Sequence, residues 1–145
     1  DPKLLKDLQQ VYGFLFNEEG KLCIVKPGEK GGWRLPGGHP EREDSDWKET
    51  IIRESMEEAD VELDPSSLKI LGIIKNSPKS DNCERKEGYA LRVVGKITNI
   101  KEQTEDEAEG LINERKFIDP KDFLKYCNWG KFGEHIKNLA VKEME

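Results

Sequence analysis

The chain has 145 residues, of which 37% are charged and 34% hydrophobic, and its formal net charge is -6. This length fits a single domain over residues 1–145, and the hydrophobic third suffices for a core, so we do not expect a disordered chain. The negative charge argues against duplex nucleic acid as a partner, because phosphate backbones are bound by basic surfaces.

The first half of the chain predicts a hairpin, a further short strand and one long helix. Segments rich in β-branched and aromatic residues are typical of strands: Val11–Phe16, Leu22–Val25 and Trp33–Leu35. Turn residues between the first two segments predict a β-hairpin, and a Pro-Gly-Gly turn ends the third. A polar loop follows, in which Ser45 or Asp46 would cap a helix over Trp47–Ala59.

The second half predicts more strands and two helices. The expected strands are Leu68–Lys75, Tyr89–Ile97 and Arg115–Ile118. Residues 102–110 are acidic, and we expect them to be solvated. A helix would begin at Asp119-Pro120, because proline suits a first helical turn, and a last helix would cover Phe132–Lys142. Strands and helices alternate without a regular βαβ period, so the predicted class is α/β, a mixed β-sheet flanked by helices.

The cysteines and the apolar segments bear on the protein's environment. Cys23, Cys83 and Cys127 form no C-x-x-C pair, and free thiols in a reducing cytosol account best for their odd number. No stretch approaches the roughly 20 apolar residues that span a bilayer, and the charged start lacks an apolar signal core. We therefore expect a cytoplasmic protein without a membrane partner, either a monomer or a homodimer.

Three glutamates share one face of the expected long helix. Glu54, Glu57 and Glu58 stand at i, i+3 and i+4, which places them within about 100° of the helix circumference. Mg²⁺ or Mn²⁺ would relieve their mutual repulsion, and such ions also bind substrate phosphates. Arg53 would pair with a carboxylate and fix its rotamer. Taken alone, this pattern fits a solvated acidic face more often than a metal site.

The segment from Gly38 to Val61 resembles the Nudix box, G-x5-E-x7-R-E-U-x-E-E-x-G-U, in which U is aliphatic. The matching residues are Gly38, Arg53, Glu54, Glu57, Glu58 and Val61. The preceding Trp33–Gly38 and the later Glu114–Ile118 are similar to segments that often flank the box. The resemblance implies a Nudix-type α/β/α sandwich. It also implies hydrolysis of a phosphoanhydride bond in a nucleoside diphosphate linked to another moiety, or in a nucleoside triphosphate.

The chain departs from this pattern in four places. One residue too many separates Gly38 from Arg53, and Asp44 stands where the first glutamate belongs. Ser55 replaces an aliphatic residue, which would weaken packing by about 1–2 kcal/mol if the site is buried. Asp60 replaces a glycine that ends the helix in a left-handed conformation, which Asp tolerates at modest cost. None of the four changes alters the three glutamates of the helix.

The resemblance implies a role for each residue of the box. Glu54, Glu57 and Glu58, with the carbonyl of Gly37, would hold Mg²⁺ or Mn²⁺, and Arg53 would complete the catalytic set. The ions would neutralise phosphate charge and activate a water molecule. The alternative is a catalytically silent Nudix domain that binds nucleotides as a sensor or scaffold.

Substrate contacts and the general base are less well defined. Candidates for substrate binding are Trp33, Arg34, Gly38 and His39, although Trp33 would also suit the core and His39 an exposed loop. The base would be Glu54 or an acid in a later segment. The later candidates are Glu105, Glu107, Glu109 and Glu114. We expect a nucleotide or nucleotide derivative as substrate, but no pattern downstream of the box specifies which one.

Overall fold

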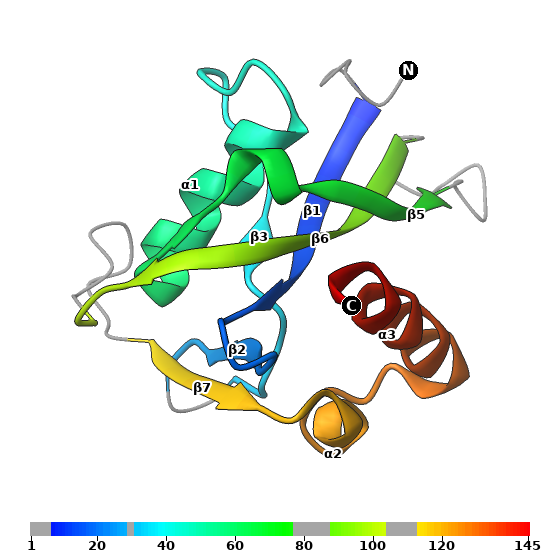
Figure 1. Cartoon of the computed structure of the whole chain (residues 1–145). Coiled ribbons are helices and arrows are strands. Elements are labelled where there is room, and N and C mark those ends of the chain that lie inside the picture. Colours follow the sequence, from blue (N-terminus) through cyan, green and yellow to red (C-terminus); the bar gives the residue numbers. More distant parts are fainter. Residues whose placement is uncertain (1–6, 29–30, 77–87, 104–112) are drawn as a thin grey trace.

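The structure is a computed structural model that describes residues 7–28, 31–76, 88–103 and 113–145 (Figure 1). Its strands are β1 (Leu8–Phe16), β2 (Leu22–Lys26), β3 (Gly37–Gly38), β4 (Val61–Leu63), β5 (Lys69–Asn76), β6 (Gly88–Ile100) and β7 (Glu114–Ile118). Its helices are α1 (Trp47–Ala59), α2 (Phe123–Tyr126) and α3 (Gly130–Met144), with short 3-10 turns at η2 (Pro65–Ser67) and η3 (Pro120–Asp122).

Within the described residues, the strands form one mixed sheet of seven. The main order is β4-β6-β1-β2-β7, with β3 attached to β1 and β5 attached to β6. β1 runs parallel to β6 along most of its length, and the other pairs are antiparallel. The mixed sheet and its flanking helices confirm the predicted α/β class.

The helices cover opposite faces of this sheet (Figure 1). Because side chains alternate along a strand, Val11 and Leu15 of β1 join Ile51 of α1 in one buried cluster. Phe14 of β1 instead joins a second cluster with Phe123 of α2 and residues of α3. The result is the α/β/α sandwich that the resemblance implies. In the described part of the chain, no helix has both the length and the apolar character needed to cross a membrane.

The predicted hairpin and long helix are confirmed. Asn17 accepts hydrogen bonds from the backbone N–H groups of Glu19 and Lys21 at 3.0 and 2.9 Å, which holds the turn between β1 and β2. Asp46, not Ser45, caps α1 by accepting from the Glu49 N–H at 3.0 Å.

The C-terminus of α1 shows how the chain accommodates its departures from the box. Asp60 adopts the left-handed conformation, with φ 53° and ψ 44°, and its N–H bonds to the Met56 carbonyl. Ser55 is fully buried, and its hydroxyl donates to the Ile51 carbonyl at 2.6 Å. The serine therefore satisfies its polar group within the helix where the family pattern has an aliphatic side chain.

Two predicted elements differ from the observed ones, and one observed strand was not predicted. The predicted strand Trp33–Leu35 is wrong: only Arg34 bridges to Val25, and the following Gly37–Gly38 forms β3 against Val11 and Tyr12. Pro36 separates these two pairings and has no N–H to donate. β4 was not predicted, since three residues carry too little periodicity. α3 begins two residues earlier and ends two residues later than predicted.

Candidate active site

Two glycines place the backbone of β3 directly against its neighbours. Gly37 has a φ of 153°, and a Cβ built on it would lie 2.1 Å from the Val11 carbonyl oxygen and 2.6 Å from the Tyr12 ring. A Cβ on Gly38 would lie 2.7 Å from the carboxylate of Glu54. Only glycine fits at position 37, and a larger residue at position 38 would displace the Glu54 carboxylate, so the pair forms a close corner between the sheet and α1.

Glu58 is fixed at this corner by two donors. Its side chain is 6% exposed, and one carboxylate oxygen accepts from the Gly37 N–H at 2.8 Å. The other oxygen forms an ion pair with the Arg34 guanidinium. Arg34, predicted as a substrate contact, therefore also positions a glutamate of the box.

Arg53 forms ion pairs with several carboxylates of the acidic cluster. Its guanidinium lies 3.0 Å from both Asp44 and Glu54, and 3.3 Å from Glu57. It also donates to the His39 carbonyl at 3.0 Å, so that it ties the loop before α1 to the helix. The predicted pairing of Arg53 with box carboxylates is confirmed.

Asp44 is the most enclosed partner of Arg53. Besides Arg53, it accepts from the Thr50 hydroxyl and the Glu41 N–H, each at 2.9 Å. Burial alone would raise the pKa of Asp44, but the hydrogen bonds from Arg53, Glu41 and Thr50 outweigh it and lower that pKa below its usual value. Asp44 thus replaces the first glutamate of the pattern as an ionised anchor for the arginine, a role that the sequence did not suggest.

Glu54 has the opposite electrostatic character. Burial, followed by repulsion from Glu58 and Glu57, raises the pKa of Glu54 to about 7, although Arg53 opposes the shift. Glu54 therefore exchanges its proton near neutral pH. A cation placed beside it would stabilise the ionised form.

The arrangement fits a hard cation in its chemistry but is not assembled as a metal site. Glu54, Glu57 and Glu58 offer carboxylate oxygens, the donors that Mg²⁺ and Mn²⁺ prefer, and Gly38 leaves space beside Glu54. Among the described residues, however, no three acidic, histidine or cysteine side chains form a ready metal-binding group. Glu57 is 42% exposed and contacts Arg53 through one carboxylate oxygen at 3.3 Å, so it could bind an ion through its other oxygen.

The other predicted residues that the structure describes make contacts outside this corner. Trp33 packs edge-on against Tyr126, with ring centroids 6.1 Å apart. His39 is exposed, and its Nδ1 donates to the Gln9 carbonyl at 2.7 Å. Glu114 is 65% exposed and lies 3.9 Å from Lys26. Glu105, Glu107 and Glu109 lie outside the described residues, and so does Cys83.

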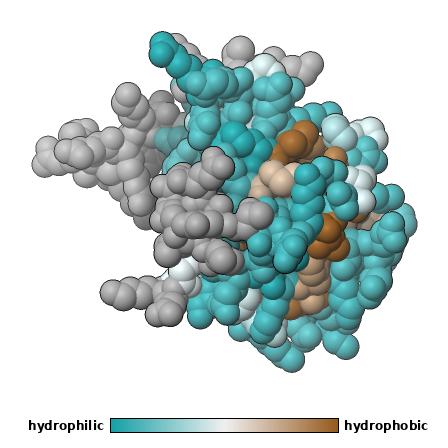
Figure 2. All heavy atoms as spheres, turned by 90° about the vertical axis from the view of Figure 1, so that its left-hand side faces the viewer, coloured by the Kyte–Doolittle hydropathy of each residue, from teal (hydrophilic) through white to brown (hydrophobic). Residues whose placement is uncertain are grey.

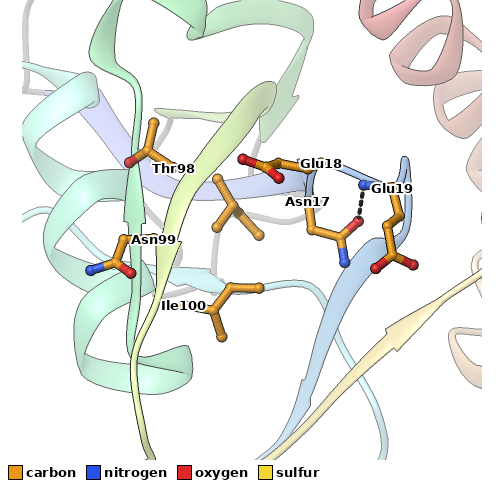
Figure 3. A pocket seen from close by; sticks show the side chains of 7 residues that line it. Asn17, Glu18, Glu19, Thr98, Asn99 and Ile100 are labelled. Atoms are coloured by element: carbon orange, nitrogen blue, oxygen red, sulfur yellow. Dashed lines mark hydrogen bonds between the residues drawn. The ribbon is translucent and has the colours of Figure 1, made fainter.

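The surface formed by the described residues includes two hollows. One, of about 590 Å³, lies between α1 and β4 and includes Arg53 and Glu57 with apolar neighbours such as Met56 and Leu63. Figure 2, which views the side of the molecule that carries α1, shows hydrophobic surface between hydrophilic borders. The other, of about 250 Å³, lies between the β1–β2 turn and the end of β6 (Figure 3). It contains none of the predicted site residues.

Comparison with known proteins supports this description. A family model of the NUDIX domain matches residues 7–138. No curated protein is similar enough in sequence to match the chain.

Solved structures share the fold at low sequence identity. A MutT protein from Methanosarcina mazei is 20% identical, with a TM-score of 0.59 and coverage of 98% of this chain and 99% of that one. An ADP-ribose pyrophosphatase from Streptococcus suis is 19% identical, with a TM-score of 0.64 and coverage of 100% and 93%. An Ap4A hydrolase from C. elegans is 13% identical, with a TM-score of 0.58 and coverage of 92% and 96%.

Proposed function

Because the chain belongs to the Nudix hydrolase family, we propose that it hydrolyses a pyrophosphate bond in a nucleotide. The substrate would be a nucleoside diphosphate linked to another moiety, or a nucleoside triphosphate. The observation that carries the proposal is the meeting of Glu54 and Glu58 with the glycine corner, while Arg53 pairs with Glu54 and Glu57. The names of the fold relatives, an ADP-ribose pyrophosphatase and an Ap4A hydrolase among them, support a substrate of this class.

Mg²⁺ or Mn²⁺ would be held by Glu54, Glu57 and Glu58 together with the carbonyl of Gly37. Once bound, the ion would neutralise phosphate charge and lower the pKa of a water molecule. Arg34 keeps Glu58 oriented at the corner. Arg53 does the same for Glu54 and Glu57. Both arginines thus act on the carboxylates before any substrate arrives.

Glu54 is our preferred general base. In the metal-free protein the pKa of Glu54 is about 7, so its carboxylate can accept a proton near neutral pH, and a cation bound beside it would lower that pKa. Gly38 lies against its carboxylate, so a substrate phosphate can approach it without meeting a Cβ. Glu109 and Glu114 remain alternative bases. Trp33 and His39 remain candidates for contact with the nucleotide.

The test is product analysis over a panel of nucleotides with Mg²⁺ or Mn²⁺, using Glu57→Gln as the diagnostic variant. We expect kcat to fall by at least about 100-fold, because one carboxylate ligand loses its charge. Glu57 is exposed, so the fold should survive. Glu62→Gln is the matched control, since Glu62 on β4 pairs with groups outside the box, such as Lys101 at 3.0 Å. Equal rates for the two variants would overturn the assignment of Glu57.

A catalytically silent nucleotide-binding domain is the second candidate. It is favoured by the ion pairs that Arg34 and Arg53 already make with the box carboxylates, and by the lack of an assembled metal-binding group among the described residues. Binding of a nucleotide without any product, across the whole panel and both metals, would establish this second function instead.

The cellular setting is also proposed. Cys23 and Cys127 are buried free thiols, which suits a reducing compartment and supports a cytoplasmic location. We propose a monomer or homodimer that binds neither membrane nor duplex nucleic acid.

A further inference from the structure

A second arginine lies on the opposite face of the sheet from α1. Arg92 of β6 is the register partner of Tyr12 on β1. Its guanidinium carbon lies 5.2 Å from the centre of the Tyr12 ring and 4.9 Å from that of Trp129, which precedes α3. The cation therefore contacts two aromatic rings, an interaction that stabilises a guanidinium without neutralising its charge.

The hydrogen-bonding capacity of Arg92 is mostly unused. In the described part of the chain no carboxylate pairs with it, and its Nη1 reaches only the Leu91 carbonyl at 3.3 Å. Its Nε is buried and has no hydrogen-bond partner among the described residues. Burial lowers the pKa of Arg92, which records the cost of placing this charge away from water. A buried donor without an acceptor is uncommon in native proteins, and an acceptor supplied by a ligand would explain it.

Arg92 is also connected to the candidate active site. Tyr12 is the register partner of Gly37 on its other side, and its ring lies 2.6 Å from the position of a Gly37 Cβ. Gly37, Tyr12 and Arg92 thus stand in line across three neighbouring strands. Two strand spacings amount to about 10 Å. Glu58 reaches Gly37 from the α1 side of the sheet, whereas Arg92 lies on the other side. Among the described residues β3 pairs with β1 alone, so a substrate that contacts both groups would pass round the open edge of β3.

We infer that Arg92 binds a phosphate group of the substrate that lies beyond the pyrophosphate unit held at the box glutamates. Arginine suits this role, because its planar fork donates two parallel hydrogen bonds to phosphate oxygens. The inference rests on the proposed function and narrows it. Substrates with three or more phosphates, such as nucleoside triphosphates and dinucleoside polyphosphates, would be favoured over nucleotide sugars with two.

The first test measures binding without turnover. Inorganic tripolyphosphate is titrated into the full chain in EDTA, with calorimetry and tryptophan fluorescence as readouts, since Trp129 adjoins Arg92. We expect Arg92→Gln to raise Kd at least about tenfold and Arg92→Lys to raise it less, because lysine keeps the charge but loses the fork. Arg42→Gln, at an exposed loop position, is the control and should leave Kd unchanged.

Two further measurements separate a ligand contact from a structural one. The Arg92→Gln variant should raise KM for a nucleoside triphosphate at least about tenfold, with kcat and the kinetics of a nucleotide sugar little changed. Its thermal midpoint without ligand should stay level or rise, since an uncompensated charge leaves the interior. A merely structural arginine would instead lower the midpoint and leave the preference between substrates as it was.

The outcomes are distinct from those for the proposed function. Tripolyphosphate that binds neither the wild-type protein nor any variant overturns the inference, as does an equal Kd for Arg92→Gln and Arg42→Gln. Glu57→Gln should abolish turnover and keep metal-free binding. If wild-type protein turns over no nucleotide but still binds tripolyphosphate through Arg92, the proposed hydrolysis fails while the anion contact stands.

Discussion

Each face of the sheet carries an arginine, and the surroundings of the two arginines differ. On the α1 face, four carboxylates surround Arg53, with N–O distances of 3.0 to 3.3 Å, those of Glu41, Asp44, Glu54 and Glu57. On the α2–α3 face, Arg92 adjoins the rings of Tyr12 and Trp129 and has no carboxylate partner among the described residues. Neighbouring carboxylates thus balance the charge of Arg53, whereas no carboxylate among the described residues balances the charge of Arg92.

We therefore expect Arg53 to stabilise the site and Arg92 to bind a ligand. The side-chain partners of Arg53 are acids, so its removal would leave buried charge behind. Removing Arg92 would leave no buried carboxylate without its cation in the described part of the chain. Loss of stability should therefore follow substitution on the first face, and loss of binding should follow substitution on the second.

The largest expected effect is that of Arg53→Gln on stability. Asp44 is 8% exposed and would be left as a buried charge without its cation, at a cost of about 3–5 kcal/mol in the free energy of unfolding. Urea unfolding monitored by circular dichroism measures this, with Arg92→Gln as the comparison. If Arg92→Gln destabilises the protein as much as Arg53→Gln does, the contrast between the two faces is lost.

The next effect concerns the glycine corner. A Cβ at Gly38 would overlap the Glu54 carboxylate, so Gly38→Ala must displace that group. We expect turnover to fall about 100-fold, which corresponds to about 2.7 kcal/mol in the barrier. Gly32→Ala is the matched control, because a Cβ there meets nothing within 4 Å. Steady-state kinetics that leave the two alanine variants equal would show that the position of Glu54 is unimportant.

A smaller effect depends on pH and on the raised pKa of Glu54, about 7 in the folded protein against 4.5 as its ordinary value. Between these values the folded state keeps a proton that the unfolded state has lost, so the contribution of Glu54 to stability declines as pH rises. Above the pKa that Glu54 has in the folded protein, this contribution to stability is lost completely. In EDTA, Glu54→Gln should therefore be more stable than wild type by about 1–3 kcal/mol at alkaline pH.

The pH dependence has its own check. At a pH near 4 the advantage of Glu54→Gln should vanish, because the wild-type carboxyl is then protonated in both the folded and the unfolded state. Thermal midpoints of the two proteins across this range measure it. A constant difference at every pH would mean that the ionisation of Glu54 is not the cause.

The smallest effect is expected for Ser55→Ala on the inner side of α1. The hydroxyl bonds only to the Ile51 carbonyl, and alanine is the better helix former, so stability should change by less than about 1 kcal/mol. Ile51→Ala in the same helix should cost about 2–5 kcal/mol, because it opens a cavity in the core. Chemical denaturation of both variants compares them. A large loss for Ser55→Ala would show that the serine does more than fill space.

The sequence predicted what depends on local signals. The turn at Asn17, the cap at Asp46 and the left-handed end of α1 at Asp60 all follow from chemistry within a few residues. Spacing alone put Glu54, Glu57 and Glu58 on one helix face, while their assignment as metal ligands stays a prediction.

The features that the sequence did not predict depend on contacts between segments that are far apart in the chain. The pairing of Arg34 with Glu58 spans 24 positions along the chain, and that of Arg92 with Trp129 joins β6 to the start of α3. Nothing near Trp129 in the sequence marks its ring as a neighbour of a cation. The short β4 exists because β6 offers an edge to Val61 and Leu63.

The two buried cysteines can report separately on the opening of the two layers that cover the sheet. Cys23 belongs to the cluster on the α1 side and Cys127 to the cluster on the α2–α3 side. Burial raises the pKa of the Cys23 thiol to about 12 and that of Cys127 to about 11, so neither is reactive in the closed protein. In a Cys83→Ser background, the alkylation rate of each thiol would then report how often its own layer opens.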